Sequence, residues 1–280
     1  MRTGKIALKD RFAFLGEDGA DPQLEYYLPY NMPEMGWQDK KRPVLLVCPG
    51  GGYHFVSERE SEPIALNYLT RGYNVFVLTY SCDPICFPHQ LNEVAAAFEL
   101  INENADEWNC DMENTAIMGF SAGGHLAAHY STSYNCEEVR ANFPESIKPK
   151  VSVLCYPVIT AEKPLTHYGS FYSLLGHFPN GEEGDKYSCE KLVSDDTPPA
   201  YIWANADDSG VPCVNSLRYA TALSQHNIPF ELHIFPFGGH GLSTANDQTL
   251  GDVAPIIHEV TSWLTESADF MEKFLTKKFQ

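Results

Sequence analysis

Residues 119–123 (GFSAG) have the form G-x-S-x-G, which places Ser121 between two glycines. A short apolar run, residues 115–118, precedes the motif, and small residues with helical character, 125–131, follow it. A strand, a sharp turn and a helix in this order present a nucleophilic serine, and glycines fit there because side chains would clash across the turn. We predict that Ser121 is the nucleophile of an acyl-transfer reaction. The alternative is a structural glycine-rich turn.

A serine hydroxyl needs a base and an orienting carboxylate to attack an acyl group near neutral pH. His240 follows the apolar run 230–235 by a short glycine-rich loop. Asp207 and Asp208 follow the apolar run 200–204. Because the active sites of open α/β sheets lie outside the carboxyl ends of the strands, these groups can converge with the serine. We predict His240 as the base and favour Asp208 over Asp207 as its partner, although this choice depends on geometry that a sequence lacks.

Acyl transfer also needs backbone N–H groups that stabilise the negative charge on the substrate oxygen. The residue after the nucleophile, Ala122, is expected to provide one of them. The other should come from the loop after an earlier strand, and three glycines follow the apolar run 44–47 and Pro49. Glycines there let the backbone approach the substrate, so we predict Gly51 or Gly52 as the second donor. A plain glycine-rich turn is the alternative.

The remaining histidines and cysteines form no convincing metal-binding pattern. His125 and His129 are four residues apart, but leucine directly follows His125 where a zinc-protease helix needs glutamate. His233 lies inside an apolar run and is interpreted as structural. Cys82 and Cys86 form one close pair that no second pair complements. We expect reduced cysteines, no metal and no cofactor.

Apolar runs and helix-like stretches alternate along the chain, which predicts a mostly parallel sheet with helices on both faces. The expected strands cover residues 44–47, 75–78, 115–118, 151–155, 200–204 and 230–235. The expected helices cover about residues 58–70, 89–104, 125–131, 214–225 and a last stretch from about 253. Residues from about 160 to 196 do not continue this alternation of strands and helices. We interpret them as a small lid-like insertion in a single domain, 1–280.

The composition limits the classes of function. The chain has 280 residues, with 44% hydrophobic and 20% charged residues, as in globular proteins. Its net charge of −18 disfavours binding to nucleic acids and to anionic membranes. No apolar stretch approaches the length of a membrane span, and the N-terminus carries no run of signal-peptide length, so we expect a cytoplasmic protein.

Taken together, these segments resemble the α/β-hydrolase esterases of the acetyl-xylan-esterase and carbohydrate-esterase-like group, which are related to the hormone-sensitive-lipase-type esterases. The similar segments span nearly the whole chain in matching order: residues 49–53, 119–127, 170–176, 206–217 and 231–242. Nothing before Leu24 matches the family pattern. The resemblance implies an α/β-hydrolase fold and the following site residues: Ser121, His240, Asp208, Gly51, Gly52 and Ala122.

The resemblance also implies a serine esterase of short acyl chains. We expect it to hydrolyse acetyl esters above all, including those of acetylated sugars, through a Ser-His-Asp triad and an acyl-enzyme. Aromatic residues in the insertion are expected to narrow the acyl side of the site. The alternatives are another acyl hydrolase on the same fold, such as an arylformamidase or a peptidase, and a non-catalytic ligand-binding relative. The expected partner is a small-molecule ester, and homo-oligomerisation stays open.

Overall fold

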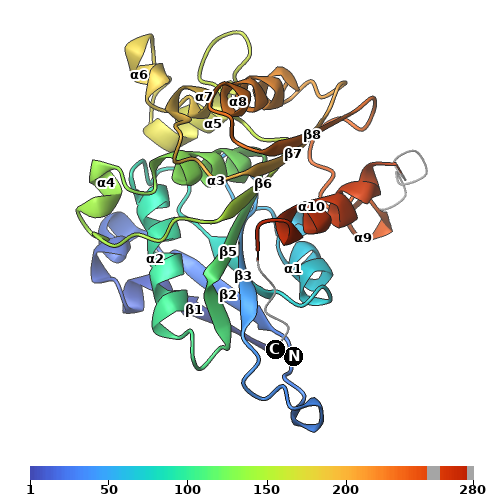
Figure 1. The fold of residues 1–280 in the computed structure, drawn as a ribbon. Coiled ribbons are helices and arrows are strands. Elements are labelled where there is room, and N and C mark those ends of the chain that lie inside the picture. The colour runs from blue at the N-terminus through green and yellow to red at the C-terminus, as the bar shows by residue number, and fades with distance from the viewer. Residues whose placement is uncertain (251–258, 276–280) are drawn as a thin grey trace.

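The structure is a computed structural model that describes residues 1–250 and 259–275. One eight-stranded sheet runs through it in the order β1-β2-β4-β3-β5-β6-β7-β8 (Figure 1). The strands are β1 (Arg2–Ala7), β2 (Gln23–Leu28), β3 (Arg42–Cys48), β4 (Asn74–Thr79), β5 (Cys110–Phe120), β6 (Val151–Cys155), β7 (Ala200–Asn205) and β8 (Phe230–Phe235). Strand β2 is antiparallel to both of its neighbours, whereas β3 to β8 pair in parallel. The predicted α/β-hydrolase fold class is confirmed.

The six expected strands correspond to β3 to β8, and β6 and β8 have the predicted bounds. Their apolar runs are continuous because parallel strands are covered on both faces. Strand β5 begins five residues earlier than predicted, at Cys110, where its pairing with β3 shifts register between Pro43 and Val44. Strands β1 and β2 were not expected. They carry charged and half-exposed residues, so neither forms a continuous apolar run.

Helices cover both faces of the sheet. The α-helices are α1 (Glu62–Leu69), α2 (His89–Glu103), α3 (Ser121–Ser133), α4 (Glu137–Arg140), α5 (Tyr168–Leu175), α6 (Glu182–Asp185), α7 (Cys189–Leu192), α8 (Val214–Gln225), α9 (Asp247–Leu250) and α10 (Trp263–Glu272). Short 3₁₀ helices are η1 (Leu8–Asp10), η2 (Ala13–Gly19), η3 (Pro33–Met35), η4 (Glu58–Glu60) and η6 (Val260–Ser262). No helix in the described ranges is long and apolar enough to cross a membrane.

The helix predictions are confirmed for α2 and α8, and two others are corrected. The expected helix 58–70 is divided into η4 and α1, and α3 begins at Ser121 itself rather than after the glycines. Part of the last expected helix, 253–258, lies outside the described residues. Within the described residues, η6 and α10 are the last helices.

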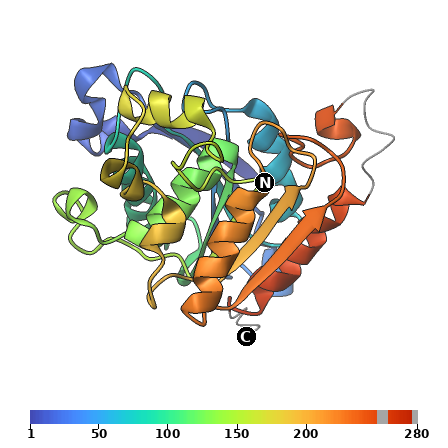
Figure 2. The same ribbon diagram turned by 90° about the horizontal axis from the view of Figure 1, so that it is seen from above.

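The alternating side chains of β3 show how the sheet divides the core. Leu46 packs in a cluster with Leu126 of α3 and Leu223 of α8. Its neighbour Leu45 packs in a second cluster with Ile64 of α1 and Trp263 of α10. Successive side chains of a strand point to opposite faces, so one apolar strand supplies both cores. Figures 1 and 2 show α2, α3 and α8 on one side of the sheet and α1 and α10 on the other.

The insertion at 160–196 contains α5, α6 and α7, although the sequence suggested irregular structure there. In Figure 2 its yellow helices lie on the same side of the sheet as α3, and α7 packs against both α3 and α8. Asn215 of α8 fastens the beginning of the insertion. Its Oδ1 accepts hydrogen bonds from the N–H groups of Ile159 (3.0 Å) and Thr160 (3.1 Å). Its Nδ2 donates to the carbonyls of Leu165 and Pro212, each at 3.0 Å.

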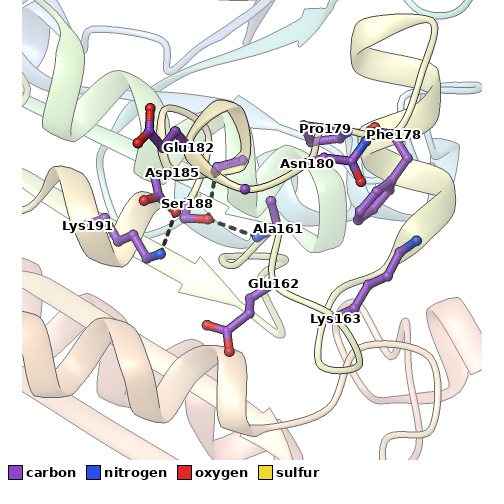
Figure 3. A pocket seen from close by; sticks show the side chains of 12 residues that line it. Ala161, Glu162, Lys163, Phe178, Pro179, Asn180, Glu182, Asp185, Ser188 and Lys191 are labelled. Carbon is purple, nitrogen blue, oxygen red and sulfur yellow. Dashed lines mark hydrogen bonds and ion pairs between the residues drawn. The ribbon is translucent and has the colours of Figure 1, made fainter.

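The insertion also contains a cavity of about 470 Å³ (Figure 3). Lys163 and Phe178 lie on one side of it, and Glu182, Asp185 and Lys191 lie on the other. All the residues that line it belong to the insertion, so this cavity is distinct from the site around Ser121.

Candidate active site

Ser121 lies at the sharp turn between β5 and α3, and its φ angle is +53°. A left-handed backbone is unfavourable for a residue other than glycine and must be held by its surroundings. A Cβ atom on Gly119 would lie 2.1 Å from the carbonyl oxygen of Gly123. A Cβ atom on Gly123 would lie 2.1 Å from the carbonyl oxygen of Cys48 in β3. Both glycines of the motif are therefore required by the close approach of backbone segments.

Three side chains that are far apart in the sequence form a continuous chain of hydrogen bonds. The Oγ of Ser121 lies 2.7 Å from Nε2 of His240, and Nδ1 of His240 lies 2.6 Å from Oδ2 of Asp208. The other carboxylate oxygen of Asp208 accepts hydrogen bonds from the N–H groups of Gly210 (2.9 Å) and Val211 (2.8 Å). An ionised carboxylate only accepts, so Nδ1 carries the proton and Nε2 can accept the serine proton.

Asp207 has a different place from its neighbour. Its side chain is exposed and accepts hydrogen bonds from the N–H groups of Gly238 (3.2 Å) and Gly239 (2.9 Å). The hydrogen bond from Gly239 holds the pKa of Asp207 below its usual value. Asn205 donates to the Gly239 carbonyl at 2.8 Å. Asp207 thus fastens the loop before His240, whereas Asp208 contacts the imidazole.

The loop after β3 contains the two predicted glycine donors. Gly51 has a φ of +127° and Gly52 a φ of +68°, both in the region that favours glycine. A Cβ atom on Gly51 would lie 1.9 Å from the Phe55 carbonyl oxygen. Within residues 1–250 and 259–275, the N–H groups of Gly51 and Gly52 donate to no protein atom. Ala122 lies in the first turn of α3, where backbone N–H groups lack partners inside the helix.

A buried carboxylate next to this loop was missed by sequence reasoning. Glu60 is 3% exposed, and its Oε2 accepts a hydrogen bond of 2.7 Å from the Gly50 N–H. Its Oε1 accepts a hydrogen bond of 2.6 Å from the hydroxyl of Tyr156. Burial raises the pKa of Glu60, and these hydrogen bonds oppose the rise. The sequence gives no signal for this role, because Glu60 stands among polar residues typical of an exposed segment.

His167, at the start of the insertion, is a second residue that sequence reasoning missed. It caps α5, and its Nδ1 accepts from the backbone N–H (3.3 Å) and the hydroxyl (2.8 Å) of Ser170. Burial lowers the pKa of His167. A Cβ atom on Gly52 would lie 3.9 Å from Cε1 of this ring, so His167 faces the glycine loop. His167 lies three residues before the segment 170–176 that resembles the esterase family, so the resemblance did not point to it.

The three other histidines considered in the sequence, His125, His129 and His233, lie in structural positions. His125 accepts from the Tyr53 hydroxyl at Nδ1 and donates to the Tyr187 carbonyl at Nε2, each at 2.8 Å. Burial lowers the pKa of His125 to about 4 and that of His129 to about 3. His233 lies 3.0 Å from a carboxylate oxygen of Glu231. In the described part of the chain, no group of three or more His, Cys, Asp or Glu side chains could hold a metal ion.

Comparisons with known proteins show the family to which the chain belongs. Residues 30–223 match the BD-FAE family. The chain is 41% identical over 218 residues to an endo-1,4-beta-xylanase B of Butyrivibrio fibrisolvens, covering 75% of this chain and 34% of the relative. It is 32% identical over 254 residues to an acetylxylan esterase of Xylanibacter ruminicola, covering 85% of this chain and 48% of the relative. The chain thus spans between a third and a half of these two relatives.

A solved structure is similar over its whole length. An acetyl ester-xyloside bifunctional hydrolase of Caldicellulosiruptor lactoaceticus is 33% identical and superposes with a TM-score of 0.82. The match covers 98% of this chain and 97% of that one. The resemblance to acetyl-xylan esterases found in the sequence is confirmed. The chain is an α/β-hydrolase esterase that belongs to the BD-FAE family.

Proposed function

We propose that this esterase hydrolyses short-chain acyl esters, above all acetyl esters of carbohydrates, with Ser121, His240 and Asp208 as its triad. The continuous hydrogen bonds from Ser121 to His240 (2.7 Å) and from His240 to Asp208 (2.6 Å) carry the proposal. The carbohydrate part draws on the relatives, which include an acetylxylan esterase and an acetyl ester-xyloside hydrolase.

In the proposed reaction, the oxygen of Ser121 attacks the acyl carbon while its proton passes to Nε2 of His240. The electron pair of the carbonyl bond moves to oxygen, where N–H groups of Ala122 and of Gly51 or Gly52 stabilise the charge. When the C–O bond to the alcohol breaks, His240 returns the proton to the leaving oxygen. A water molecule then gives a proton to His240 and attacks the acyl carbon. The bond between that carbon and the Ser121 oxygen breaks, the acid leaves, and His240 returns the proton to the serine oxygen. Asp208 stays ionised and stabilises the imidazolium.

The insertion bears on substrate size, but its large apolar and aromatic residues divide into a buried and an exposed group. Phe171 and Leu174 are buried and hold the insertion on the body, where Phe171 packs on the ring of His125 at 5.1 Å. Tyr168 and Tyr172 are about half exposed, at 50% and 51%. Tyr168 already stacks on Phe178, with ring centroids 4.6 Å apart, so the exposed ring of Tyr172 is the better candidate to stack on a sugar or an aryl group. The buried pair instead serves packing.

A panel of esters tests the substrate class. We expect kcat/KM on p-nitrophenyl esters of two to twelve carbons to be highest for acetyl and to fall beyond butyryl, because each ill-fitting methylene costs about 1–3 kcal/mol. Acetylated xylo-oligosaccharides should be hydrolysed, and formylkynurenine, the arylformamidase substrate, should not. A maximum at eight carbons or longer would refute the short-chain assignment.

A second experiment tests the nucleophile. Ser121→Ala should fold and lose on the order of 10⁶-fold in kcat. An organophosphate should label the wild-type protein at Ser121 and leave Ser121→Ala unlabelled. Turnover by Ser121→Ala within tenfold of wild type would reject Ser121, and an unlabelled wild type without turnover would favour the non-catalytic ligand-binding alternative.

A further inference from the structure

The carboxylate of Glu60 lies directly beside the turn that carries the nucleophile. A Cβ atom on Gly50 would lie 2.7 Å from Oε2 of Glu60 and 3.0 Å from Cβ of Ser121. Glu60 therefore approaches the backbone from which both the glycine loop and the serine turn project. A fully buried carboxylate is costly unless its oxygens are paired, so its presence at this point needs a reason.

The two oxygens of Glu60 are bonded to different parts of the site. Oε2 accepts from the Gly50 N–H in the glycine loop at 2.7 Å. Oε1 accepts from Tyr156, which follows β6, at 2.6 Å. The same Tyr156 hydroxyl accepts a hydrogen bond of 2.9 Å from the N–H of Ser243, which lies three residues after His240. One carboxylate thereby connects the glycine loop to the histidine loop.

Tyr156 brings this connection to the catalytic base. Its ring packs edge-on against the imidazole of His240, with the ring centroids 5.1 Å apart. The backbone of Tyr156 is in the left-handed region, with a φ of +37°. Its N–H donates to the carbonyl of Trp203 at 2.6 Å. Three hydrogen bonds, with Glu60, Ser243 and Trp203, and an uncommon backbone conformation thus fix the ring against which His240 packs.

The hydrogen bonds indicate a charged Glu60. The Gly50 N–H can only donate, and the Tyr156 hydroxyl already accepts from Ser243 and donates its own proton to Glu60. Both oxygens of Glu60 are therefore acceptors. Burial raises the pKa of Glu60, and the hydrogen bonds from Tyr156 and Gly50, together with attraction to His240 and Arg59, oppose that rise and favour the charged carboxylate. When His240 takes the serine proton it becomes a cation, so this charge favours the transition state over the ground state.

From these contacts we propose that Glu60 is a positioning residue of the esterase: its buried carboxylate holds the glycine loop against the serine turn and stabilises the imidazolium of His240 through Tyr156. The proposal rests on the proposed function, since it assigns Glu60 a part in that reaction. Glu60 does not touch the reacting atoms and exchanges no proton with the substrate.

Glu60→Gln is the direct test, because it keeps the shape and removes the charge. Its amide oxygen can stay on the Gly50 N–H, and its NH₂ group must then donate to the Tyr156 hydroxyl, so the hydrogen bond to Tyr156 is reversed and the negative charge is gone. We expect kcat on p-nitrophenyl acetate to fall about 10- to 100-fold, the range of a supporting residue around a catalytic group. KM should change less than about threefold, since the residue acts through others.

The pH profile separates this role from a merely structural one. The acid limb of kcat/KM reports protonation of the base in the free enzyme. Among the charged or titratable groups around His240 are Asp208, Glu60, His167 and Arg59. Glu60→Gln removes one negative charge and leaves the others, so imidazolium is less stable and the acid limb should move to lower pH.

Glu93→Gln is a matched control. Glu93 is also buried and also accepts two hydrogen bonds, from the N–H and the hydroxyl of Ser81, and burial raises its pKa to about 7. This variant should leave the acid limb in place. An unmoved limb together with kcat within twofold of wild type in Glu60→Gln would overturn the proposal, as would equal shifts in both variants.

Tyr156→Phe gives a second test if Glu60→Gln does not fold. It removes the hydroxyl that donates to Glu60 and accepts from Ser243, while the Glu60 carboxyl itself is kept. We expect about tenfold lower kcat, in keeping with the loss of these two buried hydrogen bonds. An unchanged kcat would count against the proposal. The proposed function fails separately, if Ser121→Ala keeps wild-type turnover.

Discussion

Replacing Asp208 by asparagine is expected to disable the base by moving its proton. The N–H groups of Gly210 and Val211 both donate to Oδ1 of Asp208. An asparagine must keep its carbonyl oxygen at that position, which turns its NH₂ group toward Nδ1 of His240. Two donors would then face each other, so the neutral imidazole would carry its proton on Nε2. In that form it cannot accept the proton of Ser121.

The size of the effect follows from this geometry. Loss of the correct tautomer costs about 10⁴-fold in kcat when a triad carboxylate becomes an amide. Asp207→Asn is the matched control, because the same chemical change is made one residue away. Asp207 is exposed and holds the N–H groups of Gly238 and Gly239, of which an asparagine oxygen can retain one. One lost hydrogen bond of about 1 kcal/mol corresponds to roughly a fivefold effect.

The assay is kcat on p-nitrophenyl acetate for the two variants and wild type, with folding checked by circular dichroism. Asp208→Asn should be at least about a thousand times slower than Asp207→Asn, the ratio of the two effects above. If Asp207→Asn were the slower enzyme, the orienting carboxylate would be Asp207. If Asp208→Asn kept activity within tenfold of wild type, the tautomer argument would be refuted.

Two further predictions concern histidines outside the triad. Nδ1 of His167 accepts from the Ser170 N–H, so its proton lies on Nε2, which donates to no protein atom within the described residues. His167→Asn keeps a good helix cap, but its side chain is too short to reach a ligand. Its kcat/KM should therefore fall about tenfold more on acetylated xylo-oligosaccharides than on p-nitrophenyl acetate. Equal losses on both substrates would show a purely structural role. Burial lowers the pKa of His129 in the folded protein to about 3, whereas its pKa in the unfolded chain is about 6.5. The unfolded chain therefore binds a proton first as the pH falls below about 6.5, and the folded protein loses stability. Urea unfolding should therefore show a smaller loss of stability between pH 6.5 and pH 4 in His129→Leu than in wild type, and identical losses would contradict this assignment.

The sequence predicts the strands that are buried on both faces and fails where exposure changes the pattern. Strands β3 to β8 were expected because their apolar runs are continuous. Strands β1 and β2 were not, because charged residues such as Lys5 and Glu25 pair on their surface. The insertion was located by its break in rhythm, but its helices α5 to α7 are short, and periodicity is a weak signal over so few residues.

The residues of the candidate site likewise divide into those that the sequence predicts and those that only the structure reveals. Ser121 and His240 could be predicted because each follows a strand in a glycine-rich context. Asp208 was favoured over Asp207, but the sequence could not decide between them, because adjacent residues differ only in the direction of their side chains. Glu60 could not be found at all. Glu60 is buried next to Tyr156, which follows β6, and next to the histidine loop, and both segments are distant from it in the sequence.

The hydrogen bonds of Asn215 have a consequence for how substrate enters. All four hydrogen-bonding positions of its amide are used, and three of them tie residues 159–165 to α8. A lid that opens at a lipid–water interface would have to break these hydrogen bonds, although the Asn215 side chain is fully buried. These hydrogen bonds anchor the beginning of the insertion to α8. We therefore expect no interfacial activation, so that hydrolysis should follow the concentration of dissolved ester without a jump when micelles form.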